Sequence, residues 1–423
     1  MSKASAADPA SARAGQPADE AMWRRITREL ADDLASDAIA RERAGKSPFD
    51  EVSRLREAGL LELLTPAGPA GPGADWATAC AVIREIAAAD SSIGELLARH
   101  YALTWSARFF GSADHASSGA ARHKSRPAEE HWLLGGSTDL PGAGPGAGLT
   151  LTPTGEGYVL NGRRVFAAGV SVADRLVLGA SCTRTGDPLL VLVDPDSPGV
   201  LIDALSERLG QRLSGAGSVG FDGTRVGPDQ ILGTLPHDEH TVSPFTALAP
   251  QALRLALTHV SLGIAEGALA EARDISRTNP HARPATAAGD DPYADRPSGD
   301  PYLLLAYGEL ATAVRTAAAL VEHATTALAG AVLAGPELGV DEQADAAILV
   351  AAAETVADNT AVDLTMRILQ LTSHTRPLDD STGLDRFWRN ARVLTAGNSP
   401  THRLRDIGDH FLNGAHPPFA PGA

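Results

Sequence analysis

The sequence predicts an α+β protein built in the order all-α, all-β, all-α. Apolar residues recur at helical spacing from about Trp23 to Phe110, the period changes to two between Trp132 and Leu232, and helical spacing returns from Pro250 to Leu412. A chain of 423 residues can hold two or three domains and bury a substantial core. The expected divisions are a disordered polar tail at residues 1–20, an N-terminal helical domain at 21–130, a central β domain at 131–235 and a C-terminal helical bundle at 245–415.

Local signals place the first helices. Trp23, Ile26, Leu30 and Leu34 recur at three- and four-residue steps, as an amphipathic helix requires. A second helix is predicted from Trp76 to Ile86, and the Asp90-Ser91-Ser92 run before Ile93 is typical of the N-cap of a third. The Pro- and Gly-rich run at residues 65–73 indicates a loop between them.

The central segment has the alternation expected of strands. Asn161-Gly162 stands between two short apolar runs, and this dipeptide predicts a type I′ hairpin because that turn needs positive φ at both central residues. The apolar run Leu189–Val193 predicts another strand, closed by a turn over Asp194–Gly199.

Three long apolar-periodic stretches, at residues 251–275, 302–334 and 341–371, predict the helices of an antiparallel bundle. The loop Thr278–Asp300 between the first two is expected to be either a lid over a site or disordered. The run Ala346–Ala353 is apolar on nearly every side, which requires burial in a core or an interface. We therefore expect a homo-oligomer, most simply a tetramer.

Composition excludes several classes of protein. The formal net charge of −16 argues against a nucleic-acid-binding protein and against a basic membrane-surface module. Two cysteines cannot form a disulfide scaffold or a four-thiolate zinc site. The N-terminus lacks the apolar segment of a signal peptide, and we find no uninterrupted apolar stretch of the roughly 18 residues that a membrane span needs. The expectation is a cytoplasmic globular protein.

The strong catalytic signatures are missing from the sequence. It contains no G-x-S-x-G nucleophile elbow, no phosphate-binding G-x-x-x-x-G-K-[ST] loop and no H-E-x-x-H zinc motif. The histidines show no metal-ligand spacing, so no metal site is expected. Residue patterns alone therefore lead to an α-β-α globular protein and no further.

Five segments resemble a known family. Leu55–Leu61 and Arg84–Gly94 are similar to the N-terminal helical domain of the acyl-CoA dehydrogenase superfamily, and Gly157–Phe166 is similar to its middle β domain. Gly210–Gly217 and Asp385–Arg392 resemble the monooxygenase branch, which includes dibenzothiophene monooxygenase and related sulfur-acquisition enzymes. The resemblance covers residues 23–412 in order. It implies the acyl-CoA dehydrogenase fold, with an N-terminal helical domain, a central β domain and a C-terminal four-helix bundle, usually assembled as a homotetramer.

The resemblance also implies a chemistry. Members of this branch take reduced FMN from a separate flavin reductase and use O2 to form a flavin hydroperoxide, which oxygenates a small organic substrate. FMN is expected rather than FAD, because the branch uses diffusible reduced FMN. The expected function is that of a two-component monooxygenase in secondary metabolism or sulfur acquisition.

Some family site residues carry over. His100 matches the histidine beside the flavin ring, where an imidazole would hydrogen-bond the peroxide, although it could also be a core or surface histidine. Tyr101 would line the same pocket or serve packing. Arg277 matches an arginine that often binds the flavin phosphate, although a solvent-exposed arginine fits the position as well. Asn398 matches a family Asp or Asn and is the second expected catalytic residue.

Other positions at the expected flavin edge depart from the family. Ala168 replaces the usual Ser or Thr, Gly397 replaces a histidine, and Gly135-Gly136 replaces a position that often carries Asn. The Gly-rich turn of the family reads Thr372-Ser373-His374 here. The remaining cofactor-binding residues implied by the resemblance are Gly136, Ser137, Phe166, Ala167, Ala168 and Ser373.

Acyl-CoA dehydrogenation needs a carboxylate base within reach of the substrate α-proton. Neither family position for this base is acidic, because one falls at Thr372–Thr375 and the other near Leu253. A dehydrogenase is therefore not expected. The departures at the flavin edge leave one alternative to the monooxygenase, a flavin-independent or catalytically altered protein that reuses the cleft of this fold.

Overall fold

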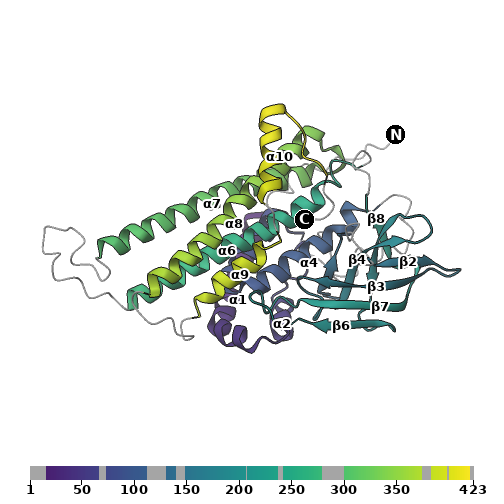
Figure 1. Ribbon diagram of the computed structural model, residues 1–423, viewed down its shortest axis with the longest axis horizontal. Helices are drawn as coiled ribbons and strands as arrows, with labels where there is room; N and C mark the ends of the chain where they lie inside the picture. Colours follow the sequence, from purple (N-terminus) through teal and green to yellow (C-terminus); the bar gives the residue numbers. More distant parts are fainter. Residues whose placement is uncertain are drawn as a thin grey trace, which may run out of the picture.

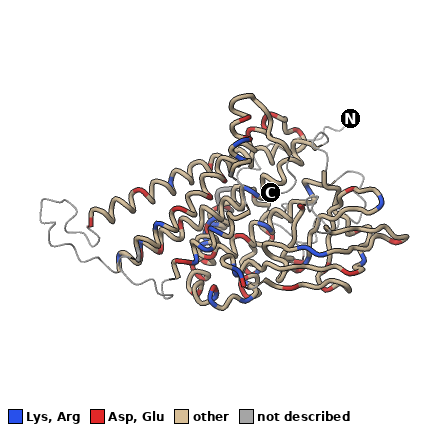
Figure 2. Tube along the Cα trace, in the orientation of Figure 1, with Lys and Arg blue, Asp and Glu red and all other residues tan. Residues whose placement is uncertain are grey.

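The computed structural model describes residues 16–65, 73–111, 130–139, 148–205, 207–236, 242–278, 300–373, 383–397 and 400–419. Figure 1 shows an elongated molecule with a long helical bundle at one end and a sheet at the other, joined by the N-terminal helices. The predicted α-β-α order is confirmed. Lys and Arg residues are interspersed with Asp and Glu along the helices and strands of the view in Figure 2.

The N-terminal helices are α1 (Gln16–Ala44), α2 (Phe49–Glu57), α3 (Trp76–Ala89) and α4 (Ser91–Phe109). Helix α1 begins at Gln16, inside the segment expected to be disordered. Asp90 is the N-cap of α4 as predicted, because its side chain accepts hydrogen bonds from the backbone N–H groups of Ser92 and Ile93 at 3.1 and 3.3 Å. Most of the loop predicted at 65–73 lies outside the described residues.

The central sheet contains β1 (Leu134–Ser137), β2 (Thr150–Pro153), β3 (Tyr158–Phe166), β4 (Arg175–Cys182), β5 (Pro188–Val193), β6 (Val200–Ala204), β7 (Gly217–Val226) and β8 (Ile231–Thr234). Its order is β6-β7-β3-β2-β4-β5-β8, and β1 pairs with β4 in parallel. The turn predicted at Asp194–Gly199 is present, with Ser197 N–H donating to Asp194 O at 3.0 Å. Strand β1 also contacts α4.

The prediction of a hairpin turn at Asn161-Gly162 is wrong. Strand β3 runs straight through this dipeptide, pairing with β2 on one side and β7 on the other, and a bulge in the β3–β7 pairing falls between Leu160 and Gly162. Of these two residues, only Gly162 has a positive φ, at +124°. A Cβ added to it would lie 2.9 Å from the carbonyl oxygen of Gly148. The glycine therefore serves a bulge and a close backbone approach.

The C-terminal region contains α6 (Leu248–Thr278), α7 (Pro301–Ala334), α8 (Val340–Ser373), α9 (Asp385–Thr395) and α10 (Pro400–Asn413). The three long helices match the predicted stretches within a few residues at each end. Helices α6, α7 and α8 pack together, and α3 and α4 pack on α6, so the apolar core is continuous from the N-terminal helices into the bundle. The loop expected to form a lid, at residues 279–299, lies outside the described residues.

Helix α9 joins three parts of the molecule through neighbouring side chains. The buried Asn390 accepts from the backbone N–H of Gln211 at 2.7 Å and donates to the hydroxyl of Ser91 at 2.9 Å. Next to it, Arg389 pairs with the buried carboxylate of Glu42 at 2.8 Å. The bundle, the start of α4, helix α1 and the loop before β7 are thus tied at one point.

Candidate active site

A small cleft lies where α4, β1 and the N-terminal end of α6 meet. Its floor is the segment Gly136–Asp139 at the end of β1, and its walls include Leu103 and Phe109 of α4 and Leu253 of α6. The cavity has a volume of about 30 Å³, which is room for one or two water molecules. An apolar, nearly filled cleft of this kind can exclude water from a reaction.

Two glycines give the floor of the cleft its shape. Gly136 has φ of +119°, and an added Cβ would lie 2.2 Å from the carbonyl oxygen of Val177 on β4. A Cβ on Gly135 would lie 2.8 Å from that of Ala173 and 3.0 Å from the carbonyl of Gly169. Neither position has space for the Asn that relatives often carry. Strand β1 therefore presents only backbone at these residues.

The polar corner of the cleft follows directly after the glycines. The Ser137 hydroxyl donates to the carboxylate of Asp139 at 2.6 Å, and the Asp139 N–H donates to the Ser137 hydroxyl oxygen at 3.1 Å. Arg164 of β3 donates to the backbone carbonyl of Asp139, and its guanidinium lies 3.8 Å from the carboxylate. Burial lowers the pKa of Arg164, and Asp139 opposes that shift. The sequence did not predict Asp139 and Arg164 as site residues, because they come together only when strands that are far apart in the sequence form one sheet.

His100 lies behind this floor, fully enclosed. Its Nδ1 accepts from the backbone N–H of Leu134 at 3.0 Å, and its Nε2 lies 2.8 Å from the carbonyl oxygen of Leu61. Nδ1 must therefore be unprotonated and Nε2–H must be the donor, which describes a neutral imidazole. Burial lowers the pKa of His100 to about 4. The expected direct hydrogen bond to a flavin peroxide does not fit this geometry, because the backbone already uses both ring nitrogens.

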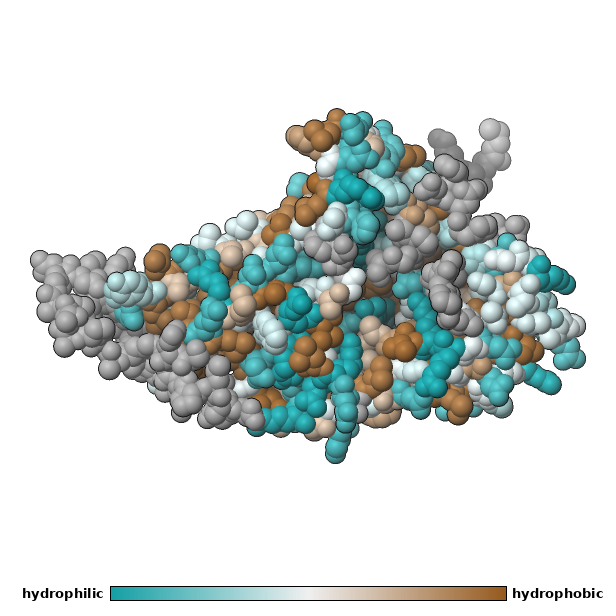
Figure 3. Space-filling view, viewed as in Figure 1, coloured by the Kyte–Doolittle hydropathy of each residue, from teal (hydrophilic) through white to brown (hydrophobic). Residues whose placement is uncertain are grey.

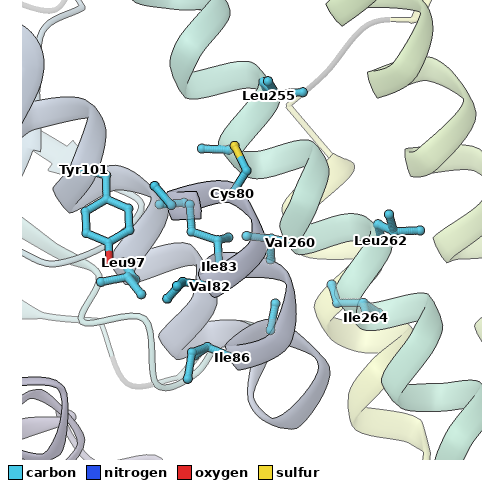
Figure 4. Packing of buried hydrophobic residues seen from close by; sticks show 14 of the residues in the cluster. Cys80, Val82, Ile83, Ile86, Leu97, Tyr101, Leu255, Val260, Leu262 and Ile264 are labelled. Carbon is cyan, nitrogen blue, oxygen red and sulfur yellow. The ribbon is translucent and has the colours of Figure 1, made fainter. Parts of the chain in front are cut away.

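Tyr101 is also buried, with its hydroxyl donating to the carbonyl oxygen of Leu60 at 2.7 Å. Figure 4 shows its ring beside Leu97 in the apolar cluster between α3, α4 and α6. Burial raises its pKa well above the usual value. Of the two alternatives for Tyr101, the geometry supports packing, and the ring does not line the cleft.

The end of β3 packs against the back of β1. Phe166 is buried in the core of the sheet, and Ala168 is 1% exposed. Ala167 is exposed, and its carbonyl accepts from Arg208 and from the Ser214 hydroxyl, each at 2.9 Å. The contact between Gly135 and Gly169 brings this segment and the cleft floor together.

Of three further expected site residues, Arg277 lies away from the cleft, and the side chains of the other two are outside the described part of the structure. Arg277 is exposed near the end of α6, where it lines a separate cavity of about 930 Å³ between α6 and α7 together with Arg273 and Arg315. Ser373 ends α8, and its side chain lies outside the described residues, as does Asn398. Gly397 is exposed, and no atom of the described residues lies within 4 Å of the place of a Cβ. Within one chain, Arg277 does not meet Gly136 and Ser137.

Comparison with known proteins identifies the family. The family models "Acyl-CoA dehydrogenase, N-terminal domain" and "Acyl-CoA dehydrogenase, C-terminal domain" match residues 17–117 and 255–397. Dibenzothiophene monooxygenase from Rhodococcus qingshengii is 31% identical over 405 residues, covering 93% of each chain. The chain belongs to the acyl-CoA dehydrogenase family.

Within this family, the similarity is to its flavin monooxygenases. A probable FMNH2-dependent monooxygenase, SfnC from Pseudomonas putida, is 30% identical over 93% of this chain and 95% of its own length. The crystal structure of TdsC from Paenibacillus sp. A11-2 with FMN and indole superimposes with a TM-score of 0.84 and 31% identity, over 95% of this chain and 99% of TdsC. The predicted fold and branch are confirmed.

Proposed function

We propose that the protein is an FMNH2-dependent monooxygenase that inserts one oxygen atom into a small organic substrate. The observation that carries the proposal is the end-to-end similarity, in sequence and fold, to flavin-dependent monooxygenases. In the balanced reaction, FMNH2 supplies two electrons, and O2 and the substrate give FMN, water and the oxygenated product.

The residues that line the cleft offer the kinds of groups that a flavin needs, and the cleft, with about 30 Å³ open, has to widen to admit the ring. The apolar walls of the cleft can exclude water from a flat ring, and its floor offers backbone groups at Gly136 and the hydroxyl of Ser137. Arg277 is a candidate for the FMN phosphate, because an exposed guanidinium pairs well with phosphate. Since Arg277 lies in a different cavity of the same chain, the phosphate contact would come from a second copy.

Helix α7 supports a homotetramer. With the turn after it, Pro301–Glu337 is apolar and long enough to cross a membrane by length and composition, yet only 39% of its most apolar stretch is buried within the chain. Its exposed residues include Tyr302, Leu305 and Leu333, and Figure 3 shows hydrophobic residues on the outside of the bundle. Coverage of this side by other copies would bury the apolar surface. A transient flavin reductase partner and a cytoplasmic location complete the proposal.

The chain's own residues define what the cleft can do. His100 holds the N–H of Leu134, the first residue of β1, and so fixes the strand whose next residues form the floor. We assign it a positioning role. Leu253 stands at one of the two places where dehydrogenases carry their base, and its apolar side chain cannot take a proton. The described part of the site therefore favours oxygenation over dehydrogenation.

Stopped-flow mixing tests the proposal without knowledge of the substrate. Photoreduced FMN, with and without the protein, is mixed with aerated buffer, and reoxidation is followed by absorbance. Binding of FMNH2 is expected to change the time course in proportion to protein concentration, and 18O from 18O2 is expected in the product once a substrate is found. Identical traces with and without protein would favour the flavin-independent alternative.

A further inference from the structure

Arg99 is one of two charged side chains among the described residues that line the cleft, and Asp139 is the other. Asp139 lies beside the guanidinium of Arg164. Arg99 belongs to α4, and the next residue of this helix, His100, accepts the backbone N–H of Leu134. The helix therefore lies against the start of β1 at this point, and Arg99 shares the cleft with the residues at the end of that strand.

The guanidinium of Arg99 has more hydrogen-bond donors than partners. Its side chain is only 21% exposed, and its Nε donates to the carboxylate of Glu95, one helical turn away, at 2.9 Å. A guanidinium has five N–H donors, four of them on the two Nη nitrogens. Within the described part of the chain, these Nη donors of Arg99 have no acceptor. They are available to a ligand in the cleft.

Glu95 balances the charge of Arg99 and leaves its Nη donors free. The Glu95 side chain is 3% exposed, and one of its two oxygens has no partner among the described residues. A guanidinium buried without a counter-ion would be strongly destabilising, so this pair allows a cation to stay beside an apolar cleft. Arg99 lines the cleft and Glu95 does not, so the positive end of the pair faces a ligand.

The flavin ring changes its charge when it is reduced. The ring of oxidised FMN is neutral, whereas the reduced ring readily loses its N1 proton and then carries negative charge over N1 and the C2 carbonyl oxygen. A positive charge near this edge favours the reduced anion over the oxidised form. Both atoms are hydrogen-bond acceptors, and a guanidinium can pair with two neighbouring acceptors as it does with a carboxylate. The free donors of Arg99 have the chemistry that this edge of the ring requires.

We propose that Arg99 binds the edge of the flavin ring formed by N1 and the C2 carbonyl, and that it makes the cleft bind FMNH2 more tightly than FMN. This inference rests on the proposed function. A protein that receives FMNH2 from a separate reductase has to capture the reduced form while oxidised FMN competes for the same cleft. Arg99 favours the reduced form, and Glu95 limits the preference by offsetting part of the charge.

The test compares the affinities of the full chain for FMN and FMNH2, and it needs neither a substrate nor turnover. Both Kd values are measured by anaerobic equilibrium dialysis, with photoreduced FMN as the reduced form. Arg99→Gln is expected to lower the ratio of the FMN Kd to the FMNH2 Kd by roughly tenfold or more, because a charge-assisted hydrogen bond is lost. The midpoint potential of the bound flavin should then fall by about 30 mV for each factor of ten in this ratio.

A second variant should move the ratio in the opposite direction. Glu95→Gln keeps the shape of the side chain but removes the charge that opposes Arg99, so the ratio is expected to rise. Arg99→Lys keeps the charge and should restore part of the preference. Arg24 is the matched control, because it forms the same i, i+4 pair with Glu20 at 2.7 Å on α1, with both side chains exposed. Arg24→Gln should leave the ratio unchanged.

The outcomes distinguish this inference from the function on which it rests. If the parent binds both forms of FMN and Arg99→Gln leaves the ratio unchanged, Arg99 does not select the reduced ring and the inference is wrong. A loss of affinity for both forms by the same factor would also contradict it, because a merely structural role gives that result. If the parent binds neither form, the proposed function fails together with the inference.

Discussion

Replacing His100 by alanine would test its assigned role. The change removes the acceptor for the Leu134 N–H and the donor for the Leu61 carbonyl, both buried in the core. Each backbone group left without a partner costs about 1–3 kcal/mol, and the lost ring volume adds a cavity penalty. We expect the free energy of unfolding to fall by roughly 3–5 kcal/mol, a large part of the ~5–15 kcal/mol typical of a protein.

Urea unfolding followed by tryptophan fluorescence measures this loss, at one protein concentration for all variants because assembly affects stability. His100→Asn should recover part of it, since the asparagine oxygen can accept from Leu134 as Nδ1 does. The exposed His402 on α10 is the matched control, and His402→Ala should cost less than about 0.5 kcal/mol.

The same residue predicts a dependence on pH. The folded pKa of about 4 lies below the unfolded value of 6.5, so between these values the unfolded chain binds the extra proton. Stability is fully present above pH 6.5 and is lost as pH falls toward 4, by up to about 3 kcal/mol from this group. A loss below 1 kcal/mol in His100→Ala, with acid sensitivity unchanged, would refute the positioning role.

Other expected outcomes concern three further sites. Burial lowers the pKa of His259 to about 3, so His259→Gln should also flatten the loss of stability below pH 6.5, measured by urea titration at several pH values. Gly136→Ala should lower the Tm by several degrees and impair FMNH2 binding, because its Cβ would overlap the Val177 carbonyl. Glu354→Gln should lower the free energy of unfolding by about 1.5–3 kcal/mol, since the buried Arg403 would lose its carboxylate partner at 2.6 Å and keep that of Asp358 at 3.6 Å.

Controls separate these effects from general sensitivity to substitution. Gly220→Ala places a Cβ no closer than 4.0 Å to its neighbours and should leave the Tm nearly unchanged. Glu309→Gln breaks an exposed pair with Arg367 and should cost less than 1 kcal/mol. If the Glu309 change costs as much as the Glu354 change, burial is not the reason for the sensitivity at Glu354.

The sequence predicted features that depend on local signals. Helices α6, α7 and α8 follow from apolar periodicity, which the packing then buries on the expected sides. The N-cap at Asp90 follows from short-range side-chain chemistry. Such elements are set within a few residues, so they can be recognised before any tertiary contact is known.

Features that depend on distant partners were missed or misread. Asn161-Gly162 has the composition of a turn, but pairing with β2 and β7 extends the strand through it. The role of His100 is decided by Leu61 and Leu134, which only the fold brings to its two nitrogens. Phe419 lines the cleft from a segment after the last helix, and this segment has no periodic pattern in the sequence. A family resemblance predicts which residue types stand at a site. Which of their hydrogen-bonding atoms are free to contact a ligand depends on neighbouring residues that the resemblance does not identify.

The junction at Asn390 limits how ligands can reach the site. One amide side chain connects α9 to the loop before β7 and to the start of α4, and Arg389 beside it connects to α1. Hinge opening between the sheet and the bundle would break several buried hydrogen bonds at once, at a cost of several kcal/mol. Entry and exit should therefore use short surface segments while the domains move as one body. The rate of ligand entry would then depend on the surface segments around the cleft and not on rotation of one domain against another.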